Sequence, residues 1–137
     1  MATPHAAHGT AARPGRFARG VAATAGGLFV ILGVWAFLAP RSFFDTLAVF
    51  PPYNAHFLHD IGGFQIGLGA VLLFALVFAD SLRATLWGVA AGNFVHLVSH
   101  IMDTDLGGNP ATDIGFFALL TVVLVAAALD RGRAAGA

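Results

Sequence analysis

Residues 56–102 read HFLHDIGGFQIGLGAVLLFALVFADSLRATLWGVAAGNFVHLVSHIM, two long apolar stretches that are separated only by Asp80 and Ser81. Each stretch has about the 20 residues that an α-helix needs to cross the hydrocarbon core of a bilayer. So short a link makes the two helices antiparallel neighbours. The stretch therefore predicts a transmembrane hairpin, with spans at residues 56–78 and 82–102.

Two further apolar stretches flank this hairpin, at residues 17–39 and 110–129. Asn109 and Pro110 mark the start of the last one, because asparagine is a favoured N-cap and proline is tolerated at the first helical position. The sequence thus predicts an all-α fold, a bundle of four transmembrane helices over residues 16–131.

The composition supports a membrane protein. Of the 137 residues, 58% are hydrophobic and only 10% are charged, and the mean hydropathy is +0.80. This is too apolar for a water-soluble domain, so the lipid bilayer is the expected partner. The net charge is zero, which offers no basic face to nucleic acid. The chain has no cysteine, which excludes disulfides and thiolate metal sites.

Two segments lie outside the predicted spans and have features of their own. Residues 1–15 are mostly small residues with histidine, glycine and proline, and we predict a flexible cytoplasmic tail there. Residues 40–55 are rich in aromatic side chains, and Ser42 and Asp45 have capping-box spacing. We predict a short helix between the first two spans that lies in the membrane interface and covers what is beneath it.

The arginines set the expected orientation. With four spans, six of the seven basic residues fall on one side of the membrane and Arg41 alone falls on the other. Positive residues gather on the cytoplasmic side. We therefore expect a multi-pass protein of the cell membrane with both termini in the cytoplasm.

Four of the six histidines lie in the central hairpin, His56 and His59 in its first helix and His96 and His100 in its second. Because the helices are antiparallel, all four lie toward the same, extracytoplasmic end. Ionisable side chains inside spans are costly and usually face the bundle interior or a cavity. The four histidines are therefore candidates for a functional site.

The helical positions of these residues form two polar stripes. At about 100° per residue, one stripe contains His56, His59 and Asp60, and the other contains Asn93, His96, His100 and Asp103. A small-xxx-small pattern, which lets two backbones approach closely, lies beside each stripe. The two patterns are Gly63-xxx-Gly67 and Gly88-xxx-Gly92. We expect the stripes to face each other.

Imidazole and carboxylate groups together are ligands of zinc and of non-haem iron, and histidines at i and i+4 can reach one ion. The sequence therefore predicts a divalent transition-metal site, with zinc or iron as the ion. The candidate ligands are His56, Asp60, His96 and His100, with His59 and Asp103 as weaker candidates.

Other functions fit the same residues. Haem b, with one histidine from each helix as an axial ligand, would make a redox protein that exchanges electrons with quinone. Hydrogen bonds between the histidines and aspartates would instead hold together a non-catalytic accessory subunit of a larger membrane complex, or a homo-oligomer. Whether the protein is an enzyme stays open, although Asp60 or Asp103 could serve as the base for a zinc-activated water. Asp113, in the first turn of the last span, is explained by the helix dipole alone.

Three motifs carry a resemblance to a known group of proteins: Pro40-Arg41-Ser42-Phe43, Pro52-Tyr53-Asn54-x-His56-x-x-x-Asp60-Ile61-Gly62 and His96-Leu97-x-x-His100. In these residues the chain resembles a family of uncharacterised small four-helix membrane proteins, distantly similar to DoxX-like proteins. The resemblance runs from the first span to the third and implies the architecture without an activity. It carries over His56, Asp60, His96 and His100. In the family, arginine often stands at the position of His59.

Overall fold

The computed structural model describes residues 15–130, and the regular structure in this range is entirely helical. The helices are α1 (Arg16–Leu38), α2 (Pro40–Thr46), α3 (Ala55–Ala75), α4 (Leu82–Met102) and α5 (Pro110–Leu129), with a 3₁₀ turn at Ala79–Ser81. This confirms the all-α prediction. Three of these helices, α1, α3 and α5, are long and apolar enough to cross a membrane. The predicted tail, apart from Gly15, and the last residue of the predicted bundle, Arg131, lie outside the described residues.

The helix ends agree with the predicted spans to within about a turn. Asn54 and Asn109 cap α3 and α5, and their side chains accept hydrogen bonds from the N–H groups of Phe57 and Thr112. The first helix ends at Leu38 because the residue before a proline avoids the helical region. The predicted second span is too long by three residues, since α3 ends at Ala75.

Glycines allow the backbones of α1 and α3 to come into direct contact. A Cβ atom added at Gly69 would lie 2.6 Å from the carbonyl oxygen of Gly26, and one added at Gly33 would lie 2.7 Å from that of Gly62. The two glycines of each helix are seven residues apart, so both face the same neighbour. The main partner of α3 is therefore α1.

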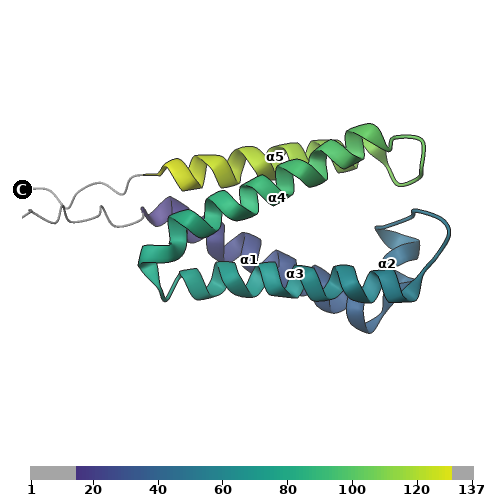
Figure 1. The fold of residues 1–137 in the computed structure, drawn as a ribbon, viewed down its shortest axis with the longest axis horizontal. Coiled ribbons are helices and arrows are strands. Elements are labelled where there is room, and N and C mark those ends of the chain that lie inside the picture. Colours follow the sequence, from purple (N-terminus) through teal and green to yellow (C-terminus); the bar gives the residue numbers. More distant parts are fainter. Residues whose placement is uncertain (1–14, 131–137) are drawn as a thin grey trace, which may run out of the picture.

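The other helix pair is α4 and α5, which run antiparallel along most of their length (Figure 1). Two hydrogen bonds from a buried side chain connect these helices. The side-chain amide of Asn93 donates to the carbonyl oxygen of Phe117 at 2.9 Å and to the hydroxyl of Thr121 at 2.7 Å. Asn93 is thus an interhelical hydrogen-bonding residue, as its place in an apolar helix requires.

The two helix pairs form layers that meet at one end and separate toward the other (Figure 1). At the end where α1 begins, one core cluster contains residues of all four long helices, with Ala22, Leu72, Leu86 and Leu124 fully buried. The second cluster lies near α2 and is built on Ala36, Phe43 and Leu58, from α1, α2 and α3 alone. The prediction that the polar stripes of α3 and α4 face each other is therefore wrong.

The short helix after the first span is present, as α2, but it does not begin as predicted. Ala39, and not Ser42, is its N-cap. The hydroxyl of Ser42 instead accepts a hydrogen bond from the indole of Trp35 at 3.3 Å. The carboxylate of Asp45 accepts from Arg41 at 2.9 Å and raises the pKa of that guanidinium.

A candidate metal-binding histidine pair

The structure divides the predicted site residues between the two helix layers. On α3, the imidazole of His56 lies 3.7 Å from the carboxylate of Asp60, and these side chains are 86% and 54% exposed. The ring of His59 packs against Phe37, with 5.2 Å between the ring centres. His59 and Asp60 border an open hollow of about 380 Å³. His56 and Asp60 are therefore exposed, and His59 packs against α1.

On α4, the spacing of His96 and His100 brings their rings together. The Nε2 atoms lie 3.2 Å apart, and the ring centres 4.9 Å apart. The side chain of His100 is only 13% exposed, whereas His96 is exposed. This distance suits a hydrogen bond between neutral rings or a shared ligand between them.

Aromatic side chains hold the two imidazoles in place. The ring of Phe117, on α5, lies against both, at 4.2 Å from His96 and 4.8 Å from His100 between ring centres. The ring of Phe50 meets His100 edge-on, at 5.7 Å. Phe50 comes from the segment between α2 and α3, so this part of the 40–55 region covers His100.

The cover is fixed by a contact between two loops. The N–H of Gly108 donates to the carbonyl oxygen of Val49 at 2.8 Å. Gly107 and Gly108 both have positive φ, a conformation that favours glycine. The glycines of the α4–α5 loop thus bring the α2–α3 segment across the open end of the two layers.

Asp113 completes the surroundings of His100. Its Oδ2 atom lies 3.9 Å from Nδ1 of His100, and the carboxylate side chain is 18% exposed. The same oxygen accepts a hydrogen bond from the N–H of Asn109 at 3.0 Å, while the Asn109 side chain accepts from the N–H of Thr112. The dipole explanation of Asp113 missed this contact. The sequence did contain a signal for this contact, the spacing of Asn109 and Asp113. Residues at this spacing can cap each other, and this capping fixes the carboxylate at the same end as His100.

The predicted ligands do not come together as one group. Within residues 15–130, no cluster of three or more histidine, cysteine or acidic side chains has the geometry to hold a metal ion. Asp103 is exposed at the C-cap of α4. Among the predicted ligands in the described part of the chain, His96 and His100 lie closest together, with their Nε2 atoms 3.2 Å apart, and Asp113 lies 3.9 Å from His100. Neither a protein-family model, nor a curated protein, nor a solved structure matches the chain.

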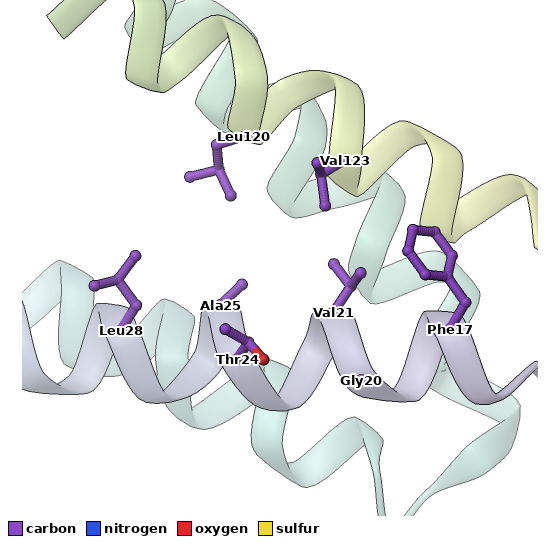
Figure 2. Close-up of a pocket in the computed structure, with 8 residues that line it drawn as sticks. All are labelled: Phe17, Gly20, Val21, Thr24, Ala25, Leu28, Leu120 and Val123. Carbon is purple, nitrogen blue, oxygen red and sulfur yellow. The ribbon is translucent and has the colours of Figure 1, made fainter. Parts of the chain in front are cut away.

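An apolar cavity of about 350 Å³ lies away from these residues, between α1 and α5. Figure 2 shows side chains of both helices projecting into it, among them Val21, Leu28 and Leu120. The described residues that line it include no ionisable group. The cavity therefore has no part in the chemistry of the histidine pair.

Proposed function

We propose that this protein spans the membrane four times, with both termini in the cytoplasm, and binds a divalent transition-metal ion through His96 and His100 at the extracytoplasmic end. The proposal depends on one observation, the 3.2 Å between the Nε2 atoms of the two rings.

The relation of α4 to α5 supports a fourth span. With 21 residues against 20, α4 matches α5 in length and runs beside it. It is less apolar than its neighbours because it carries Asn93, His96 and His100, whose side chains contact α5. At the opposite end, the N–H of Ala18 donates to the carboxylate of Asp130 at 3.2 Å. The start of α1 and the end of α5 therefore lie close together, which an even number of crossings would require.

The distance between the rings supports a shared ion. Two nitrogen ligands at 2.0–2.1 Å from a tetrahedral ion are separated by roughly 3.3 Å. His96 and His100 already have their Nε2 atoms at this separation, and the aromatic contacts restrict both rings. Two imidazoles leave further coordination positions for water or for a small molecule, and catalytic sites keep such a position open. Imidazole ligands suit zinc and iron.

The alternative function, with a structural hydrogen bond between the two rings, is supported by the same 3.2 Å distance between the Nε2 atoms. If the pair is structural, one ring donates to the other and the protein is a non-catalytic subunit of a larger assembly. Haem b has less support, because His56 is largely exposed and α3 packs mainly on α1 and not on α4.

Metal analysis of the purified protein separates these functions. Protein loaded with zinc and then desalted in detergent should retain about one ion per chain, and His96→Ala or His100→Ala should abolish retention. His56→Ala is the matched control, since it removes a histidine from the same end of the molecule, and it should retain the ion. No retained zinc in the wild type, or equal retention in His100→Ala, would refute the proposal. A haem absorption band would support the cytochrome.

A further inference from the structure

We infer that Asp113 is the positioning residue of this site, whose carboxylate orients His100 so that Nε2 of that ring faces the ion. The inference rests on the proposed function. It adds a residue that neither contacts the ion nor lies on the helix of the two histidines.

The two nitrogens of His100 face different partners. Nδ1 faces the carboxylate of Asp113 at 3.9 Å, and Nε2 faces Nε2 of His96 at 3.2 Å. A carboxylate accepts hydrogen bonds and cannot donate them when ionised, so the proton of a neutral His100 belongs on Nδ1. The lone pair on Nε2 is then free to bind a metal ion. Metal-bound histidines commonly donate their other N–H to a carboxylate in this way.

The carboxylate is held in place independently of His100. Its Oδ2 atom accepts the N–H of Asn109, which is the N-cap of α5. At 3.9 Å the contact with Nδ1 is longer than a hydrogen bond, and we expect it to shorten when the ion binds. Such hydrogen bonds are often long before the ligand binds, and they tighten in the complex.

Neighbouring groups leave this carboxylate little freedom. A Cβ atom added at Gly108 would lie 2.6 Å from the ring of Phe50 and 2.8 Å from Oδ2 of Asp113. Phe50 also meets the edge of His100. Asp113 and His100 are therefore enclosed by the same loop contact, which limits exchange with water and strengthens their electrostatic interaction.

The assignment fixes the tautomers of the metal-free pair. With its proton on Nδ1, His100 accepts a hydrogen bond at Nε2, so His96 must donate from its own Nε2–H. This arrangement can be seen by ¹⁵N spectroscopy of the imidazole nitrogens. A purely structural role for Asp113 at the helix cap would not determine which nitrogen of His100 carries the proton.

The test uses the full chain in detergent and zinc ions alone. Asp113→Asn, which keeps an oxygen for the N–H of Asn109, should weaken zinc binding by about 10- to 100-fold and shift the proton of His100 away from Nδ1. Asp60→Asn, which changes the carboxylate beside His56, should leave the affinity unchanged. Asp113→Glu should restore part of the affinity, and it serves as the second variant if Asp113→Asn does not fold.

The outcomes distinguish the two proposals. Zinc binding by the wild type with equal affinity in Asp113→Asn would overturn the role of Asp113 and leave the proposed function intact. A wild type that binds no zinc would overturn the proposed function, and the positioning role with it. A His100 proton on Nε2 in the metal-free wild type would contradict the inference alone.

Discussion

Gly33 and Gly62 meet backbone to backbone, and a Cβ atom added to either one would lie 2.7 Å from the carbonyl oxygen of the other. Close approach of two helices at small residues maximises van der Waals contact, which is a main source of helix association in a bilayer. This contact decides which face of α3 is covered by α1, and therefore which face carries the exposed residues His56 and Asp60.

Gly62→Ala should destabilise the protein by about 1–3 kcal/mol, because the added methyl group must push two backbones apart. The measurement is unfolding in mixed detergent micelles, followed by circular dichroism. Gly63→Ala is the control at the adjacent position, where an added Cβ meets nothing within 4 Å. Equal losses in the two variants would contradict the packing of α1 on α3.

Asn93→Leu should cost about 0.6–1.7 kcal/mol, the usual value of an interhelical hydrogen bond in a membrane protein. The variant removes both bonds from α4 to α5 and leaves the carbonyl of Phe117 with its bond from Thr121. Gln65→Met is the comparison. Among residues 15–130 its buried Oε1 atom has no hydrogen-bond partner, so the apolar replacement should be neutral or stabilising. A larger loss for Gln65→Met than for Asn93→Leu would be inconsistent with these contacts.

Gly108→Ala should weaken zinc binding, because it acts on both walls of the proposed site. Its φ of +71° is unfavourable for alanine by roughly 1–2 kcal/mol, and the methyl group would displace Phe50 or Asp113. Isothermal titration with zinc measures the change. Gly115→Ala adds the same methyl group to α5 in open space and should bind as the wild type does. Unchanged affinity in Gly108→Ala would show that the loop contact does not support the site.

Topology reporters test the proposed number of crossings. A reporter after Ala137 should be cytoplasmic, and one inserted between α2 and α3 should be extracytoplasmic, because the arginines favour this orientation. A reporter after Arg83, in the first turn of α4, should again be cytoplasmic. If the reporter after Ala137 and the one between α2 and α3 were both extracytoplasmic, α4 would not cross the membrane.

The helices could be predicted from hydropathy and capping residues, since both are local properties of the chain. Their pairing could not. The small-xxx-small pattern pointed to Gly63 and Gly67, whereas α1 contacts Gly62 and Gly69. A shift of one residue turns the contact face by about 100° around the helix, which leaves the predicted polar stripe exposed. Which glycine of α3 packs against α1 depends on the facing surface of α1. The residue pattern within α3 carries no information about that surface.

The residues of the candidate site also fall into two groups, those that the sequence could pair and those that it could not. The convergence of His96 and His100 follows from their spacing on one helix, and the sequence alone sufficed to pair them. Asp113 lies on another helix and Phe50 in a distant segment, so their positions depend on the packing of α4 on α5 and on the turn at Gly107 and Gly108. Asp113 lies next to a helix cap, and its interaction with the helix dipole was a sufficient local explanation for it. Its contact with His100 was therefore not predicted.

The arrangement of the long helices as two consecutive antiparallel pairs also has a consequence for biogenesis. Because α1 pairs with α3 and α4 with α5, each pair can close soon after its second helix leaves the ribosome, and N-terminal units generally fold first during synthesis. The α1–α3 pair, with its close glycine contacts, can therefore form before α5 is complete. The histidine-bearing helix α4 follows before its own partner is made, and only α5 can bring the carboxylate that faces His100.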